Sequence, residues 1–187
     1  MICIQLMAKL KQKSPRKAPW HSRAVRRTAD WMEKLSLKQI VQVGSTARGS
    51  GRSLSNFTPA PFRLDGVNYP SFEAFWQSLK FEPSEPMRHR VAQMRAGEAK
   101  RAGSQIRTKI MFYGGRILSY GSKELVELAK RAERERFSQN SEQMHALMNT
   151  GNAILIHWVE ARDSKSLPRR VFCKILMELR DEFRNRK

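Results

Sequence analysis

The C-terminal segment of this chain has the pattern that most restricts its fold. Pro168 opens the segment, and six apolar residues follow at intervals of one, three or four positions: Val171, Phe172, Ile175, Leu176, Leu179 and Phe183. Intervals of three and four bring side chains to one face of an α-helix. The pattern therefore predicts an amphipathic helix that begins at Pro168 and buries one face.

Most of the remaining chain also has helical spacing. The expected helices span about residues 22–35, 71–80, 84–102, 104–112, 122–140 and 141–150. Serines at the first positions of five of these segments suit the N-cap: Ser22, Ser71, Ser84 (with Pro86 in the first turn), Ser122 and Ser141. The Gly114-Gly115 pair predicts a turn before the fifth helix.

A small amount of β-structure is expected beside the helices. Residues 37–43 suit a short strand, and residues 57–69 suit a hairpin or irregular β segment that turns at Asp65-Gly66. Residues 153–158 fit a strand or a helix, because periodicity cannot distinguish the two in so short an apolar run. We therefore predict an α+β fold that is mainly helical.

The glycine-rich stretch from residue 44 to residue 51 predicts a boundary. It lacks the Gly-Lys-Ser/Thr ending of a phosphate-binding loop, so we interpret it as a linker. We expect one domain over residues 49–187, preceded by a basic extension over residues 1–48 with one helix.

Composition excludes several classes of protein. The chain has 187 residues, of which 40% are hydrophobic, and this is enough to form a core. No apolar run approaches the roughly 20 residues needed to cross a bilayer. The two cysteines, Cys3 and Cys173, lie at opposite ends, which fits a reducing, cytoplasmic setting and provides too few ligands for a zinc site. His89 and His145 have no partner at ligand spacing, so we expect neither a metal nor a cofactor.

The net charge of +19 is spread over the whole chain. Residues 1–48 hold eleven Lys and Arg against Asp30 and Glu33, which gives +9 and leaves +10 for residues 49–187. Residues 86–120 hold eight Lys and Arg against Glu98 alone. This charge indicates a binding face for a polyanion, above all nucleic acid. The alternative is a solvated surface, although solubility does not need so much charge of one sign.

Two groups of arginines are the candidates for contact with nucleic acid. They are Arg23, Arg26 and Arg27 in the extension and Arg88, Arg90 and Arg95 in the domain. Trp20 and Trp31 flank the first group, and aromatic rings among arginines suit nucleic-acid contact. Trp31 equally suits docking of the expected N-terminal helix on the domain, so both interpretations stay open.

The helix expected over residues 71–80 places three polar residues on one face. Glu73, Gln77 and Lys80 are spaced i, i+4 and i+7, beside an apolar set. A carboxylate beside aromatic rings is partly desolvated, which suits it to proton transfer or to stabilising a cation. The amide can bind a ribose hydroxyl or a base edge, and the lysine can bind a phosphate. The alternative is an ordinary amphipathic helix with a solvated polar face.

A series of short motifs extends over about residues 52–183. It comprises Leu54-Ser55-Asn56-Phe57, Pro61-Phe62, Asp65-Gly66, Tyr69-Pro70-Ser71, Glu73, Gln77, Lys80-Phe81, Ala99-Lys100, Gly103, Arg136-Phe137-Ser138-Gln139-Asn140, Ala146-Leu147, Thr150-Gly151-Asn152-Ala153 and Lys174-Ile175-Leu176-Met177-Glu178-Leu179-Arg180. In order and spacing the series resembles the NADAR family, also called YbiA-like and named for its link to NAD and ADP-ribose. Each motif alone is weak, but the set is specific.

The resemblance implies a mainly helical α+β domain that binds a phosphoribosyl or ADP-ribosyl group. Members of the family cleave N-glycosidic bonds, some in ribosylated riboflavin-pathway intermediates and others between ADP-ribose and guanine. By this resemblance Glu73 is the catalytic carboxylate. The other site candidates are Asp163 as a second catalytic carboxylate, Asn56, Phe57 and Gln77 for the ribose or base, Lys80 and Arg101 for phosphates, and Tyr120 for stacking on a base.

The chain also departs from the pattern of the family. Ala74 stands where the family usually has His, Ser104 where it often has Arg, and His157 where it usually has a second Glu. A short Ser164-Lys165-Ser166 link replaces a loop that contains Trp-Gly. Two hypotheses follow: an N-glycosidase acting on a nucleic-acid-linked substrate, or an inactive domain that binds nucleic acid or serves in assembly. The retained Glu73, Gln77 and Asn56 favour the enzyme, and the departures favour the binding module.

Overall fold

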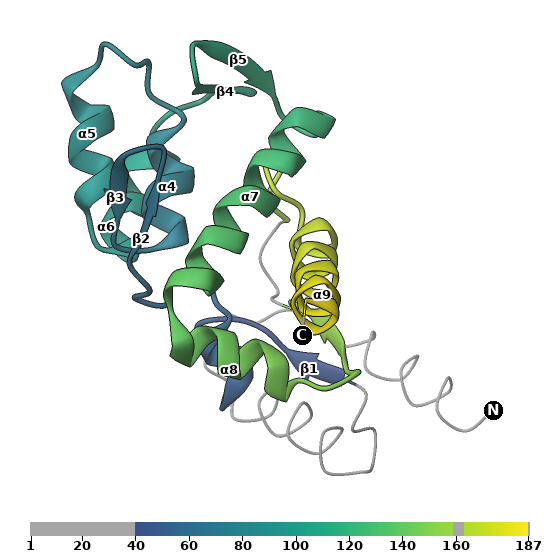
Figure 1. Ribbon diagram of the computed structural model, residues 1–187. Helices are drawn as coiled ribbons and strands as arrows, with labels where there is room; N and C mark the ends of the chain where they lie inside the picture. Colours follow the sequence, from purple (N-terminus) through teal and green to yellow (C-terminus); the bar gives the residue numbers. More distant parts are fainter. Residues whose placement is uncertain (1–39, 159–162, 187) are drawn as a thin grey trace, which may run out of the picture.

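The computed structural model describes residues 40–158 and 163–186, so the helix expected over 22–35 and Arg23, Arg26 and Arg27 lie outside the described residues. Within the described part the chain forms seven helices and six short strands (Figure 1). In chain order they are β1 (Ile40–Gln42), α3 (Ser50–Ser53), β2 (Phe62–Leu64), β3 (Val67–Tyr69), α4 (Phe72–Ser78), α5 (Pro86–Gln93), α6 (Ala96–Ser104), β4 (Ile110–Tyr113), β5 (Arg116–Ser119), α7 (Lys123–Gln139), α8 (Ser141–Asn149), β6 (Ile154–Ile156) and α9 (Arg169–Asn185). The predicted α+β class, mainly helical, is confirmed.

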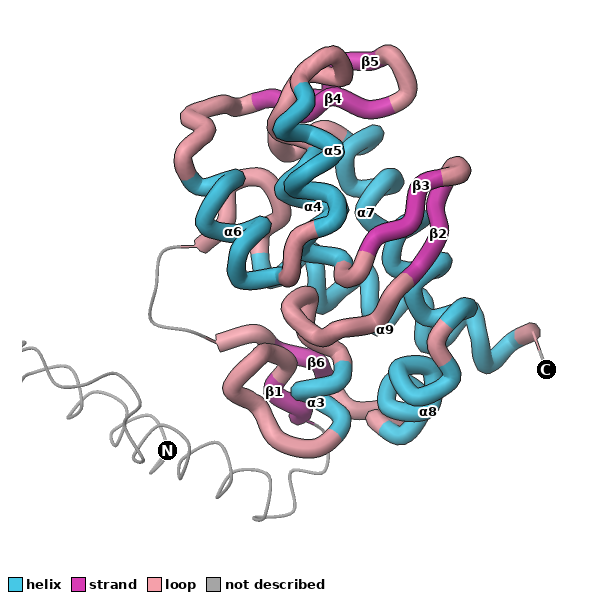
Figure 2. The backbone as a smooth tube through the Cα atoms, turned by 90° about the vertical axis from the view of Figure 1, so that its left-hand side faces the viewer, coloured by secondary structure: helices cyan, strands magenta, loops and turns pink. Residues whose placement is uncertain are grey.

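Helix α4 is buried along its whole length. Its cap is the predicted one, since the Ser71 side chain accepts a hydrogen bond from the Ala74 N–H at 3.2 Å. One side of α4 joins the main core, which also takes in α7 and α9, through Phe72, Phe75, Trp76 and Leu79. The other side packs on α5 and α6, where Ala74 and Phe81 contact Val91 and Ala99 (Figure 2). Polar groups on α4 are therefore enclosed between two layers.

The predicted turn at Asp65-Gly66 is confirmed. It joins β2 to β3 in an antiparallel hairpin that pairs Phe62 with Tyr69 and Leu64 with Val67. Both turn residues have positive φ angles, 47° and 83°. Asn, Asp and Gly are the residues that tolerate this conformation, which is why an Asp-Gly pair predicts such a hairpin.

The helix predicted over 104–112 is wrong, because α6 ends at Ser104 and residues 105–109 form a turn and loop. Residues 110–113 form β4, which pairs with β5 across a tight turn at Gly114 and Gly115, where φ is 55° and 71°. The β-branched and aromatic residues before the two glycines suit a strand. Cross-strand pairing with residues 116–119 therefore outweighed the helical spacing.

The single helix predicted over 84–102 is divided into two. Helix α5 begins at Pro86, and α6 begins at Ala96, with Met94 and Arg95 in extended conformation between them. The Glu98 carboxylate accepts a hydrogen bond from the Arg95 N–H at 3.4 Å, so the second helix has its own N-terminal cap. Both of the resulting helices pack against α4.

Strands from the two ends of the domain pair in parallel. β1 pairs with β6 in the register Ile40 to Ile154 and Gln42 to Ile156, which settles residues 154–156 as a strand. The Val43 N–H continues the ladder to the Ile156 carbonyl at 2.7 Å. β1 thus lies within the stretch predicted as the extension and ties its end to the domain.

The predicted C-terminal helix is confirmed as α9, with Pro168 at its N-cap. Its apolar stripe enters the main core, and Cys173 is buried there as predicted. On its outer side, ion pairs join α9 to α7, with Lys130 at 2.6 Å from Glu178 and Arg134 at 2.8 Å from Glu182. Among the described helices none is long and apolar enough to cross a membrane.

Candidate functional site

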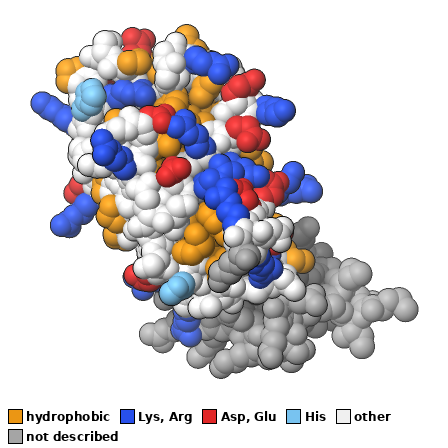
Figure 3. All heavy atoms as spheres, viewed as in Figure 1, with side chains coloured by type: hydrophobic (Ala, Val, Ile, Leu, Met, Phe, Trp, Pro, Cys, Tyr) orange, Lys and Arg blue, Asp and Glu red, His pale blue; other side chains and the backbone are white. Residues whose placement is uncertain are grey.

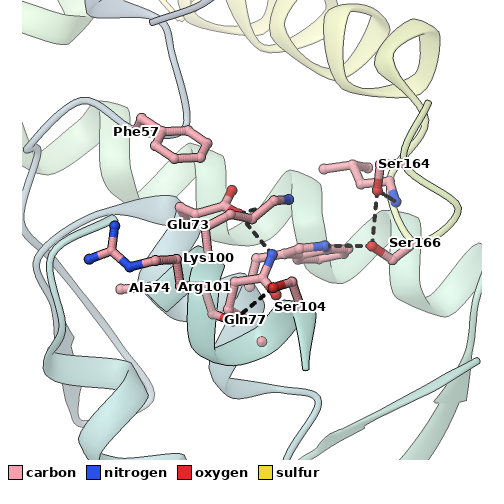
Figure 4. Close-up of polar contacts among 12 residues, drawn as sticks. Phe57, Glu73, Ala74, Gln77, Lys100, Arg101, Ser104, Ser164 and Ser166 are labelled. Atoms are coloured by element: carbon pink, nitrogen blue, oxygen red, sulfur yellow. Dashed lines mark hydrogen bonds and ion pairs between the residues drawn. The ribbon is translucent and has the colours of Figure 1, made fainter. Parts of the chain in front are cut away.

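The Glu73 carboxylate lies in the first turn of α4 and is only 4% exposed. Its Oε1 accepts a hydrogen bond from Gln77 Nε2 at 2.7 Å and forms an ion pair with Lys100 Nζ at 3.2 Å. Figure 4 shows these three side chains converging, with Phe57 to one side of them. The alternative interpretation of α4, a helix with a solvated polar face, is therefore wrong. This buried carboxylate with one half-exposed cationic partner is the centre of the candidate site.

Two lysines, one on α6 and one just after α4, bring positive charge to Glu73. Lys100 extends from α6, and its side chain is half exposed. Lys80 follows α4, and its Nζ donates to the Gly103 carbonyl at 3.0 Å. Burial lowers the pKa of Lys80, the positive charge of Lys100 lowers it further, and Glu73 opposes the shift. The sequence marked Lys100 as part of a motif and of the basic run, but gave no sign that it would contact Glu73.

Gln77 is fixed by close contact between α4 and α6. A Cβ placed on Gly103 would lie 2.0 Å from Gln77 Oε1 and 2.9 Å from Gln77 Cβ, so only glycine fits there. This contact holds the Gln77 amide so that its Nε2 faces Glu73. Gly103 therefore has a physical reason to occur in the motif series, which the sequence alone could not supply.

Asn56 reaches the site through its main chain. Its carbonyl accepts a hydrogen bond from the Glu73 N–H at 3.1 Å. The side-chain oxygens Asn56 Oδ1 and Gln77 Oε1 are buried and have no hydrogen-bond partner in the described structure. An unpaired buried acceptor is costly, and a ligand with O–H or N–H groups could satisfy one.

The C-terminal end of α7 holds the loop that carries Asn56. Arg136, Gln139 and Asn140 all donate side-chain hydrogen bonds to main-chain carbonyls of residues 54–63. The acceptors are Ser55 (3.0 Å) and Leu54 (3.3 Å) for Arg136, Arg63 (2.9 Å) for Gln139 and Pro61 (2.8 Å) for Asn140. In the sequence, residues 136–140 stood out only because they resemble a family motif. In the structure they hold the main chain of residues 54–63 in place.

Asp163 and Tyr120 are not brought to Glu73 by any contact between described residues. The Asp163 carboxylate accepts the Arg169 N–H at 3.0 Å, which caps the start of α9. Tyr120 packs against the main core, and burial raises its pKa. Their proposed roles in catalysis and stacking stay predictions.

His157 is held in a structural position. Its Nδ1 lies 2.5 Å from the Val43 carbonyl, and burial lowers the pKa of the ring. The short link that replaces the Trp-Gly loop lies against α4, because Trp76 Nε1 donates to Ser166 Oγ at 3.0 Å (Figure 4). In the described part of the chain no cluster of three His, Cys, Asp or Glu side chains could hold a metal ion.

The domain arginines predicted to contact nucleic acid differ in their surroundings. Arg88 is half-buried, and its guanidinium donates to the carbonyls of Phe81 at 2.7 Å and Phe112 at 2.8 Å. Arg90 and Arg95 are exposed on α5 and just before α6. Arg101 is also exposed, one residue after Lys100, and extends outward from α6 in Figure 4.

Comparisons with known proteins agree with this architecture. The model of the family described as Bacteriophage protein GP30.3 matches residues 49–181. Among solved structures, the NMR structure of the Escherichia coli protein YbiA is similar, with a TM-score of 0.61 and 24% sequence identity over 80% of this chain and 87% of that chain. No curated protein sequence matches. The fold is therefore YbiA-like.

Proposed function

The chain belongs to the bacteriophage protein GP30.3 family, and we propose that it is an N-glycosidase that hydrolyses a ribosyl or ADP-ribosyl N-glycosidic bond. The observation that supports this most directly is the Glu73 carboxylate, 4% exposed and held by Gln77 and Lys100. A carboxylate fixed in a water-poor site interacts strongly with a positive charge that develops in front of it.

In the proposed reaction the C1–N bond of the ribose breaks, and its electron pair leaves with the base nitrogen, which takes up a proton. The sugar then has an oxocarbenium-like centre at C1, which the Glu73 carboxylate stabilises. A water molecule adds its oxygen to C1 and gives a proton to the same carboxylate, which then releases it to the solvent, the source of the proton that the base takes up. The products are the free base and a sugar with a hydroxyl at C1.

The groups around Glu73 suit a ribosyl phosphate. The buried side-chain oxygen of Asn56 lacks a donor, and a ribose hydroxyl is of the kind that can supply one. Lys100 is half exposed, so it can turn from Glu73 toward a phosphate once the substrate is bound. Lys80 and Arg101 are the further cations proposed to meet phosphates.

Electrostatics support a nucleic-acid-linked substrate. Exposed cations without an ion pair to any described acidic residue gather on and beside α5 and α6: Arg90, Arg95, Arg101, Arg107 and Lys109. Along α7 and α9, by contrast, acidic side chains neutralise several of the basic ones, as in the pair of Arg134 with Glu182. The face drawn in Figure 3 has acidic side chains among its basic ones. Unneutralised charge beside Glu73 suits the backbone of a polymer better than a free metabolite.

We expect the native protein to cleave the N-glycosidic bond of guanine-ADP-ribosylated DNA faster than that of free phosphoribosyl compounds. The measurement is chromatographic quantification of the freed sugar, which is ADP-ribose from the modified DNA and ribose phosphate from the phosphoribosyl compounds. The enzyme hypothesis fails if no substrate is cleaved and the protein binds unmodified DNA tightly and in a salt-sensitive way. That result would support the second hypothesis, a domain that binds nucleic acid without catalysis. For both the enzyme and the binding domain, we propose that the protein acts in the cytoplasm.

Binding to DNA should depend on the unpaired cations and not on the paired ones. Each phosphate contact adds about 0.7 to the slope of log affinity against log salt for single strands. We expect Arg107→Gln on the α6 side to reduce the slope by about that amount, because it removes one contact. Arg134→Gln, which removes a cation already neutralised by Glu182, serves as the matched control and should leave the slope unchanged. Fluorescence anisotropy with a labelled single strand measures both, and equal slopes for the two variants would contradict the assignment of the binding face.

A further inference from the structure

We infer that Arg136, on α7, is a positioning residue that sets the place of Asn56 and Glu73 through the main chain of residues 54–56. This inference rests on the proposed function, because it concerns the same site. Arg136 does not touch the Glu73 carboxylate, so its effect passes through the loop.

The contacts of Arg136 converge on the two residues that precede Asn56. Its Nη1 donates to the Ser55 carbonyl at 3.0 Å, and its Nη2 donates to the Leu54 carbonyl at 3.3 Å. Its Nε donates to Glu133 Oε2 at 2.7 Å, and the guanidinium lies 4.6 Å from the centre of the Phe137 ring. The side chain is 0% exposed, so no water competes for these bonds.

The next link runs from the loop to α4. The Asn56 carbonyl accepts the Glu73 N–H at 3.1 Å, in the first turn of α4, where no intrahelical partner exists for that N–H. Phe57 follows directly, and its N–H donates to Ser55 Oγ at 3.2 Å. A shift of residues 54–56 would therefore move Asn56, Phe57 and Glu73 together.

Only an arginine can make this set of contacts. A planar guanidinium directs donors to three acceptors in a fixed fork, whereas a lysine ammonium is a compact charge on a flexible stem. Arg136→Lys keeps the positive charge beside Glu133 but loses the fork. It therefore separates the geometric role of the side chain from its charge.

Arg180 provides a matched control elsewhere in the fold. It is 4% exposed, lies on α9, and its Nη1 donates to Thr150 Oγ1 at 2.9 Å and to the Ala153 carbonyl at 2.8 Å. It therefore holds the connection between α8 and β6, and no contact of its own reaches the loop 54–57 or Glu73. Arg180→Lys tests what the loss of a buried guanidinium does to the protein in general.

The experiment compares Arg136→Lys with Arg180→Lys in the full chain. We expect Arg136→Lys to lower kcat on guanine-ADP-ribosylated DNA by about 10- to 100-fold, because displacements near 1 Å have effects of that size. We expect Arg180→Lys to leave kcat within about twofold of the native value at a temperature where both variants are folded. Hydrogen exchange gives a second readout: the Glu73 amide should exchange faster in Arg136→Lys, relative to the Leu176 amide of the core, and not in Arg180→Lys.

The outcomes separate the inference from the proposed function. If the native protein shows no hydrolysis, the proposed function fails, and the exchange of the Glu73 amide still decides whether Arg136 positions the loop. If both variants lose kcat equally, or if the Glu73 amide is affected no more by Arg136→Lys than by Arg180→Lys, Arg136 is merely structural and the inference is overturned.

Discussion

Glu73→Gln is expected to lower kcat for N-glycosidic cleavage by about 10²–10⁴-fold. The substituted amide has nearly the same shape and keeps an oxygen that can accept from Gln77, but it has no charge to stabilise an oxocarbenium-like centre and cannot accept the proton of water. KM should change little, since the ribose and phosphate contacts remain. Thermal unfolding should also change little, because a neutral side chain needs no cationic partner in a buried position.

Single-turnover release of ADP-ribose measures this prediction. Glu98→Gln is the matched control, because Glu98 is an exposed carboxylate in the first turn of α6, near the same face but without contact to Glu73. We expect it to retain the native rate. An active Glu73→Gln variant would remove Glu73 from the chemistry and leave it as a structural partner of Lys100.

Arg136→Met is expected to lower the free energy of unfolding by about 3–5 kcal/mol. The substitution leaves the Glu133 carboxylate, itself 0% exposed, without its cation. It also removes the donor to the Leu54 carbonyl and leaves the Ser55 carbonyl with the Thr58 N–H alone. Burial raises the pKa of Glu133 to about 7, against the opposing effect of Arg136. Arg136 therefore supplies the hydrogen bond and the ion pair that stabilise the charged form of the Glu133 carboxylate.

Urea unfolding of three variants tests the origin of this loss. The double variant Glu133→Leu with Arg136→Met should lose less than Arg136→Met alone, because replacing a whole buried pair avoids an uncompensated charge. Arg90→Met, at an exposed position on α5, should stay within about 0.5 kcal/mol of the native protein. A double variant less stable than Arg136→Met would show that the carbonyl contacts, and not the unpaired charge, dominate.

The helices with a strong local signal could be predicted from the sequence. Ser71 and Ser122 cap α4 and α7 as expected, since each side-chain oxygen accepts an N–H three residues later. The failures lie where local signals conflict. The spacing over residues 104–112 predicted a helix, but residues 110–113 pair with a strand that follows only after Gly115, and a pairing of that kind is not visible in a single segment.

The candidate site could be predicted only where its residues share one helix. Glu73 and Gln77 are one turn apart on α4, so their contact follows from spacing. Lys100, Gly103 and Arg136 reach the same site from α6 and α7, and that arrangement depends on how the helices pack. Asp163 lies far from Glu73 in the sequence, so spacing could not predict whether the two carboxylates meet. In the structure the Asp163 carboxylate caps the start of α9.

The pairing of β1 with β6 also sets an order of events during synthesis. Val43 and His157, at the ends of the two strands, are 114 positions apart. A ribosome adds about 5–20 residues per second, so β1 waits roughly 6–23 s before its partner strand has been made. Throughout that interval its edge is open to mispairing or to capture by a chaperone. β1 is thus translated early but pairs late, and a chain truncated before residue 154 would lack the strand that pairs with β1.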